Sequence, residues 1–173
     1  MIPKIKKILY ATDLTKNSTY AFHYAIDLAR KHKASIIILH CVEEIPLSVY
    51  ARVAYLDSAK ILRGNKNQEK KTNIVKIKEG LQQFCQSVES QVGSPCVNLV
   101  SEVIVKEGHA AEEILNAADA KKCDVIVLGT HGKGWLKHTF LGSVASSVLG
   151  KTRKPVFIIP LPSEKNSIKM GEL

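Results

Sequence analysis

Residues 35–42 have the sequence SIIILHCV, an apolar run that is continuous rather than alternating. Such a run is typical of a strand whose sheet is covered on both faces, as parallel sheets are. Further short apolar runs on either side of it predict strands at residues 5–11 (IKKILYA), 97–105, 124–129 (DVIVLG) and 155–159 (PVFII). The chain therefore has the strand content of an α/β domain.

The stretches between these runs have apolar residues at helical spacing. They predict helices at residues 17–33, 74–88, 109–122 and 143–149, with Thr15, Asn17 and Ser18 as possible caps of the first and Gly150 closing the last. Strands that alternate with helices imply right-handed crossovers. We therefore expect a single doubly wound, Rossmann-like α/β fold with a five-stranded parallel sheet in the order 3-2-1-4-5 and helices on both faces.

The length of 173 residues suits one domain, expected at residues 1–162, followed by a polar tail at 163–173. Residues 46–72 are irregular and polar. The formal charge is +9, and basic residues are concentrated in segment 52–79. Its cations are Arg52, Lys60, Arg63, Lys66, Lys70, Lys71, Lys76 and Lys78, against the acids Asp57, Glu69 and Glu79. This segment is either a solvated connection or a docking surface for an acidic partner.

The four cysteines do not form a zinc motif or a CxxC pair. They are Cys41, Cys85, Cys96 and Cys123. The first residues lack the long apolar stretch of a secretory signal, and no run is long enough to span a bilayer. We therefore expect a cytoplasmic protein with reduced cysteines and no membrane association.

Ligands of doubly wound sheets bind beyond the carboxyl ends of the strands, where the strand order reverses. Residues 11–15 follow the first strand, and GTHGKG (129–134), then Gly142-Ser143, follow the fourth. The glycines allow close backbone approach, and Gly142-Ser143 opens a helix whose free N–H groups favour an anion. The segment matches neither GxxxxGK[ST] nor GxGxxG. The residues alone leave open whether it binds phosphate or only shapes a tight loop.

The spacing from Gly129 through Gly132 to Gly142-Ser143 resembles the G-2X-G-9X-G-(S/T) signature of ATP-binding universal stress proteins. The flanking segments KKILYATDLT, IIILHCVE, GSVASSVL and KPVFIIP are also similar to that family. The resemblance covers about residues 4–160 and is weakest at 46–72. It implies an adenine-nucleotide site at the switch point.

The resemblance also assigns expected roles. Asp13 would contact adenine, and the backbone at Cys41 would contact the adenine edge in place of the family's usual aliphatic residue. Gly129 would lie near the ribose, and Gly132, Gly142 and Ser143 near the phosphates. The full predicted nucleotide-binding set is Ala11, Thr12, Asp13, Thr15, Cys41, Gly129, Thr130, His131, Gly132, Lys133, Gly142, Ser143 and Val144.

The resemblance predicts a stress-response regulator that binds ATP, with or without Mg²⁺, or another adenine nucleotide. It would act as a switch or sensor without fast catalysis, and no catalytic residue or metal ligand is predicted. A homodimer is expected through Val156, Phe157, Ile158 and Ile159. The alternatives are a slow ATPase or phosphotransferase at the same site, or a binder of acidic partners or nucleic acid through segment 52–79. Nucleic acid is not expected there, because the lysines lack interleaved aromatic residues.

Overall fold

The computed structural model of the chain describes residues 3–42, 75, 79–80, 82–83, 85–86, 97–130 and 141–160. Its elements are β1 (Lys7–Thr12), α1 (Lys16–His32), β2 (Ser35–Val42), the 3-10 helix η1 (Val97–Leu99), β3 (Val100–Glu107), α4 (Ala110–Ala120), β4 (Val125–Gly129), α5 (Ser143–Lys151) and β5 (Val156–Ile159). Residues 75, 79–80, 82–83 and 85–86 are also helical, within the helix predicted at 74–88.

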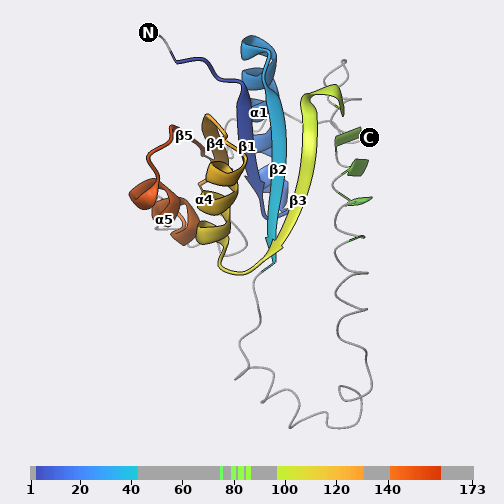
Figure 1. Cartoon of the computed structure of the whole chain (residues 1–173). Coiled ribbons are helices and arrows are strands. Elements are labelled where there is room, and N and C mark those ends of the chain that lie inside the picture. The colour runs from blue at the N-terminus through green and yellow to red at the C-terminus, as the bar shows by residue number, and fades with distance from the viewer. Residues whose placement is uncertain are drawn as a thin grey trace, which may run out of the picture.

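The strands form one parallel five-stranded sheet in the order β3-β2-β1-β4-β5 (Figure 1). This confirms the predicted fold class and strand order. Thr12 of β1 pairs with His40 of β2, and Tyr10 pairs with Val127 of β4. The chain leaves β1 toward β2 and leaves β4 toward β5, so the strand order reverses between β1 and β4.

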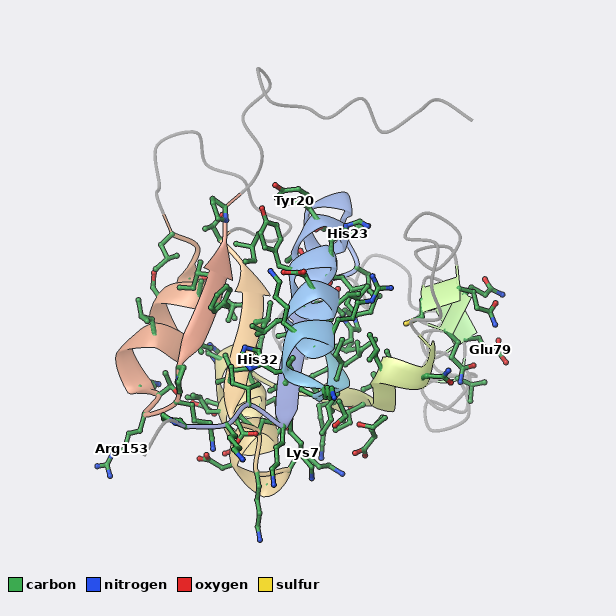
Figure 2. The ribbon with its side chains drawn as sticks, turned by 90° about the horizontal axis from the view of Figure 1, so that it is seen from above. Lys7, Tyr20, His23, His32, Glu79 and Arg153 are labelled. Carbon is green, nitrogen blue, oxygen red and sulfur yellow. The ribbon has the colours of Figure 1, made fainter. Side chains whose placement is uncertain are left out.

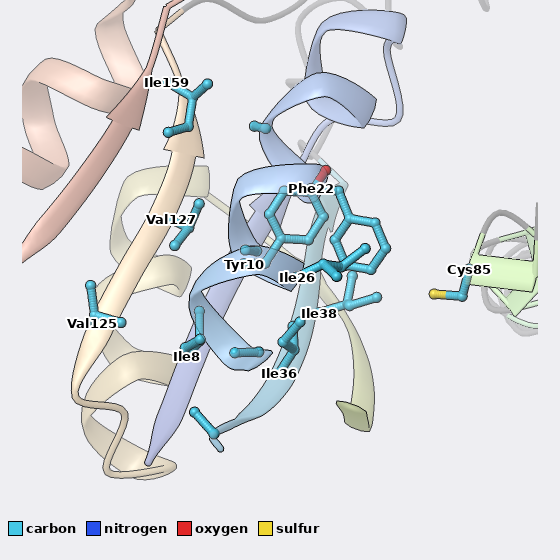
Figure 3. Packing of buried hydrophobic residues seen from close by; sticks show 14 residues of the cluster. Ile8, Tyr10, Phe22, Ile26, Ile36, Ile38, Cys85, Val125, Val127 and Ile159 are labelled. Atoms are coloured by element: carbon cyan, nitrogen blue, oxygen red, sulfur yellow. The ribbon is translucent and has the colours of Figure 1, made fainter. Parts of the chain in front are cut away.

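Both faces of the sheet are covered by helices, which explains the continuous apolar runs. Alternate residues of β1 point to opposite faces: Ile8 and Tyr10 belong to the core under α1, whereas Leu9 belongs to the core under α4 and α5. In the first core the rings of Tyr10 and Phe22 lie 4.9 Å apart between centroids (Figure 3). The sheet is therefore fixed from both sides.

Helix α1 has a capping residue at each end. Thr15 is the N-cap, and its hydroxyl accepts a hydrogen bond from the backbone N–H of Ser18 at 3.4 Å. Lys33 is the C-cap in the left-handed conformation, and its N–H donates to carbonyls of the last turn. The prediction that one of Thr15, Asn17 and Ser18 caps this helix is confirmed at Thr15.

Several predicted boundaries are wrong. The first strand runs over Lys7–Thr12 instead of 5–11, and the third helix over Ala110–Ala120 instead of 109–122. Gly150 does not end the last helix, because α5 continues to Lys151 and closes with the N–H of Thr152 on the carbonyl of Val148. The third strand begins at Val100 instead of residue 97 and runs on to Glu107. Its first predicted residues form η1 instead.

Two predicted segments lie outside the described residues. They are the polar tail at 163–173 and almost all of the basic segment 52–79, of which Val75 and Glu79 are described. Within the described part of the chain, no helix combines the length and the apolar character needed to cross a membrane.

Candidate functional site

The carboxyl ends of β1, β2 and β4 lie side by side at one edge of the sheet. Ala11 and Thr12 end β1, Cys41 lies near the end of β2, and Gly129 ends β4. The predicted residues from three separate parts of the sequence thus converge where the strand order reverses. That position is where doubly wound folds bind ligands.

Asp13 has one carboxylate oxygen bound within its own loop and one without a partner. Its Oδ1 accepts from the backbone N–H of Thr15 at 3.1 Å and from the Thr15 hydroxyl at 2.7 Å. Its Oδ2 is buried and has no hydrogen-bond partner within the part of the chain that the structure describes. A buried carboxylate oxygen without a partner is costly, so this atom is suited to receive a donor from a bound molecule.

A hydrogen-bond network holds the loop that carries Asp13. The Thr12 hydroxyl donates to Ser18 Oγ at 2.9 Å and accepts from the N–H of Leu14 at 3.1 Å. Ser18 Oγ donates to the carbonyl of Thr15 at 2.7 Å, and the Tyr10 hydroxyl donates to the carbonyl of Ser18. Burial raises the pKa of the Tyr10 hydroxyl, so Tyr10 remains a donor. The loop is therefore fixed before a ligand arrives.

Leu14 is the strained residue of this loop. Its φ of 65° is in the left-handed region that leucine rarely adopts, and its side chain is 48% exposed. A turn at Leu14 lets the main chain pass from β1 to α1 while Asp13 stays at the sheet edge. Strain of this kind is concentrated at functional sites.

His40 supports the end of β1 from the neighbouring strand. It is only 4% exposed, and its Nδ1 lies 2.8 Å from the carbonyl oxygen of Thr12. Because a carbonyl can only accept, Nδ1 carries the proton and donates. The bond holds the residue that immediately precedes Asp13.

Replacing this histidine tests the bond directly. His40→Leu leaves the buried Thr12 carbonyl without its donor and is expected to lower the free energy of unfolding by about 1–3 kcal/mol. His40→Asn offers an amide N–H in a similar position and is expected to recover much of that loss. Urea denaturation of both variants measures the difference. Equal losses would show that His40 acts through its volume alone.

The N-terminus of α5 forms the other side of the site. The N–H of Gly142 donates to the carbonyl of Thr130 at 2.7 Å, and the N–H of Thr130 donates to the carbonyl of Ile159 at 3.0 Å. These bonds fix the start of α5 beside the ends of β4 and β5. Gly142 is the N-cap and has no side chain that could accept a hydrogen bond from the first-turn N–H groups of α5, which begin at Ser143. Such a helix start favours an anion.

Some of the remaining predicted residues are described by the structure, and others are not. Cys41 is half-buried, and its Sγ lies 3.9 Å from the carbonyl of Ala110. Val144 is half-buried and Ser143 is exposed. His131, Gly132 and Lys133 lie outside the described residues, so their predicted roles stay predictions.

Two residues that support the site, Ser18 and His40, are not in the predicted set. Ser18 was considered only as a possible cap, yet its hydroxyl joins Thr12 to Thr15. His40 was visible as the polar residue in the apolar run SIIILHCV. A buried polar residue needs a partner, and that signal could have pointed to a neighbouring strand end.

No group of three or more His, Cys, Asp or Glu side chains in the described ranges could hold a metal ion. The polar groups of the site suit a ligand with both hydrogen-bond donors and negative charge. Asp13 Oδ2 would accept from the donors, and the N-terminus of α5 would receive the charge.

The chain is similar to known proteins over nearly its whole length. It is 29% identical over 168 residues to universal stress protein MJ0577 of Methanocaldococcus jannaschii, covering 94% of this chain and 97% of that protein. It is 32% identical to universal stress protein YxiE of Bacillus subtilis, covering 88% of this chain and 97% of YxiE.

Solved structures agree in fold. The structure of MJ0577 superposes with a TM-score of 0.69 at 26% identity, covering 93% of this chain and 99% of that one. A universal stress protein in complex with cAMP superposes with a TM-score of 0.53 at 16% identity, covering 91% and 98%. The model of the universal stress protein family matches residues 4–160. The chain therefore belongs to the universal stress protein family.

Proposed function

We propose that this chain binds an adenine nucleotide, ATP foremost, at the switch point between β1 and β4 and acts as a nucleotide-dependent regulator in a stress response. The observation that carries the proposal is the buried Oδ2 of Asp13, which has no partner among the described residues and lies at the same edge as the N-terminus of α5, whose N-cap Gly142 provides no side-chain acceptor. Asp13 Oδ2 can accept a hydrogen bond, and the N-terminus of α5 favours an anion. An adenine nucleotide has hydrogen-bond donors on its base and negative charge on its phosphates.

The residues divide the nucleotide between them. Asp13 would accept a hydrogen bond from the adenine moiety, and the backbone near Cys41 would contact the base edge. The first-turn N–H groups of α5, with Gly142 and Ser143, would bind phosphate oxygens through charge-assisted hydrogen bonds. Gly132, Lys133 and His131 would complete the phosphate side, and Gly129 and Thr130 the ribose side. Thr12 and Thr15 would hold Asp13 in place.

The proposal extends to a switch or sensor without fast catalysis, located in the cytoplasm. Hydrolysis of ATP requires a positioned water and an acid or metal that stabilises the transition state. Asp13 already uses Oδ1 to hold Thr15, which suits a recognition residue better than a general base. The cAMP complex of a relative with the same fold supports the nucleotide class, whereas ATP rests on the motif at Gly129 and Gly142.

The experiment that tests the proposal is mass spectrometry of small molecules released from the purified, denatured protein. It is followed by calorimetric titration of ATP and AMP into the stripped protein, with and without Mg²⁺. Co-purified adenine nucleotide, or micromolar binding, would support the site. No nucleotide and no binding in either buffer would refute it.

We also propose that the protein is a homodimer formed through β5. This strand is the last in the sheet order, so its outer side pairs with no other described strand, and Phe157 is 48% exposed. An exposed apolar edge strand tends to pair with another strand, which satisfies its free backbone groups. Val156, Ile158 and Ile159 would pair with the same strand of a second copy.

Charge on this strand is expected to separate the dimer. Phe157→Lys places a cation on the exposed face of β5 and is expected to give a monomer in sedimentation velocity at micromolar concentration. Leu149→Lys is the matched control, because Leu149 is equally exposed on α5. A dimer that survives Phe157→Lys but not Leu149→Lys would move the interface to α5.

A further inference from the structure

The edge at which the strands begin lies opposite the candidate site and carries a cluster of cations, which we call the basic edge. Its members begin or precede four neighbouring strands: Lys4, Lys6 and Lys7 at β1; Lys31 and Lys33 before β2; Lys121 and Lys122 before β4; and Lys151, Arg153 and Lys154 before β5. Figure 2 shows Lys7 and Arg153 extending outward at this edge. These residues come from four separate parts of the sequence.

The acids nearby neutralise only part of this charge. Three of these lysines each form an ion pair with one acid: Lys31 with Asp27 at 2.8 Å, Lys121 with Glu102 at 2.7 Å and Lys154 with Asp119 at 3.3 Å. Asp124 forms no ion pair with a described cation but adds one negative charge to this edge, where its Oδ2 accepts from the backbone N–H groups of Lys6 and Lys7. The cations that have no ion pair within the described residues are Lys4, Lys6, Lys7, Lys33, Lys122, Lys151 and Arg153.

Helix ends explain some of these cations but not all. Lysines at the C-terminus of a helix are favoured by its dipole, which accounts for Lys31 and Lys151. Lys33 and Lys122 also lie at the C-terminal ends of helices α1 and α4, but their φ angles of 52° and 54° lie in the left-handed region. Glycine is the favoured residue there. The sequence has an exposed lysine at both positions despite the backbone strain, which points to use of the charge.

The strand order sets the spacing of these charges. Lys33, Lys6, Lys122 and Arg153 precede β2, β1, β4 and β5, which are consecutive in the sheet. Neighbouring strands lie about 4.8 Å apart, so the row is roughly 14 Å long. One strand of duplex DNA has a phosphate about every 3.4 Å along the axis, so the row spans about four phosphates.

We propose that the basic edge binds the phosphate backbone of duplex nucleic acid without reading its sequence. Protein interfaces are enriched in aromatic residues and depleted in lysine. Anchoring in a lipid surface uses apolar side chains beside the cations. Of the large exposed apolar side chains in the described ranges, only Leu149, in the last turn of α5, is near this edge. A surface of lysines without an apolar centre fits a phosphate backbone best.

The test uses the full chain and a fluorescent 20-base-pair duplex of random sequence, with anisotropy measured over a range of NaCl concentrations. Contact with about four phosphates predicts a slope of log K against log salt of about −3 to −4. Lys33→Gly and Lys122→Gly are each expected to reduce the magnitude of this slope by about one. Both variants are expected to keep or raise Tm, because glycine relieves the left-handed strain. Lys106→Gln, which removes an exposed cation from β3 elsewhere, is the matched control and should bind like the wild type.

The following results would overturn the proposal. A slope unchanged in both glycine variants, or reduced equally by Lys106→Gln, would mean that the bound charge is not at this edge. Vesicles containing phosphatidylserine, or polyglutamate, serve as competing probes. If either binds in a Lys33-dependent and Lys122-dependent manner while the duplex does not, the edge serves a membrane or an acidic protein. Gly142→Val should leave duplex binding unchanged, which separates this surface from the nucleotide site.

Discussion

The variant Gly142→Val is expected to lose at least about a hundredfold in affinity for ATP. Gly142 is the N-cap of α5, where first-turn N–H groups would bind phosphate. A hydrogen bond to a charged group contributes about 1.5–3 kcal/mol, so losing two of them accounts for that factor. The φ of −66° at Gly142 is open to any residue, so the backbone itself does not require glycine there. A required glycine would therefore reflect the approach of a ligand. Calorimetric titration of ATP measures the loss.

The matched control is Gly150→Val, in the same helix. A Cβ at Gly150 would meet nothing within 4 Å, and valine is a better helix former than glycine. Gly150→Val is therefore expected to bind ATP normally and to be slightly more stable. Gly142→Val should remain folded by circular dichroism. If Gly142→Val folds and binds as the wild type does, the N-terminus of α5 is not the phosphate site.

The second large effect is expected at Asp13. Asp13→Asn can keep a carbonyl oxygen for the two bonds from Thr15, but it places an NH₂ donor where Oδ2 was. A donor facing the donors of adenine leaves both unsatisfied, which costs about 1–3 kcal/mol. The affinity for ATP should fall by about ten to a hundredfold. The affinity for inorganic tripolyphosphate, which lacks adenine, should change little.

The comparison between the two ligands is decisive for Asp13. Equal losses for ATP and tripolyphosphate would mean that Asp13 supports the loop instead of contacting the base. Thr15→Val provides the complementary variant, because it removes the hydroxyl bond to Oδ1 but leaves Oδ2 unchanged. It is expected to lower stability more than it lowers the selectivity for ATP over tripolyphosphate.

The fold could be predicted because strands that are buried on both faces have continuous apolar sequences, which are easy to recognise. The run at residues 35–42 was found with the predicted bounds, since it is apolar throughout and β2 lies inside the sheet. The ends of helices and strands were harder to predict, because they depend on single contacts. A glycine ends many helices, but Gly150 lies within α5, where buried Val148 and the hydrogen bond from Thr152 carry the helix onward.

The position of a site residue could be predicted where it lies next to a predicted element in the sequence. Contacts between residues of different strands could not be predicted. Asp13 follows the first predicted strand and Gly142 precedes the last predicted helix, so the pattern places both at this edge, whereas their predicted roles came from the resemblance to the family and stay predictions. The bond from His40 to the Thr12 carbonyl depends on the register of β1 against β2, which no local pattern encodes. The basic edge is similar, since its lysines are scattered along the chain and only the strand order brings them together.

The pairing of β1 with β4 has a consequence for the order of folding during synthesis. The carboxylate of Asp124 binds the N–H groups of Lys6 and Lys7 across separations of 118 and 117 residues. At about 5–20 residues per second, a ribosome needs on the order of ten seconds to deliver that partner. During this interval β1, α1 and β2 can assemble locally, but the β4 side of β1 remains an open apolar edge. The nascent chain is therefore most prone to aggregation between the emergence of β2 and that of β4.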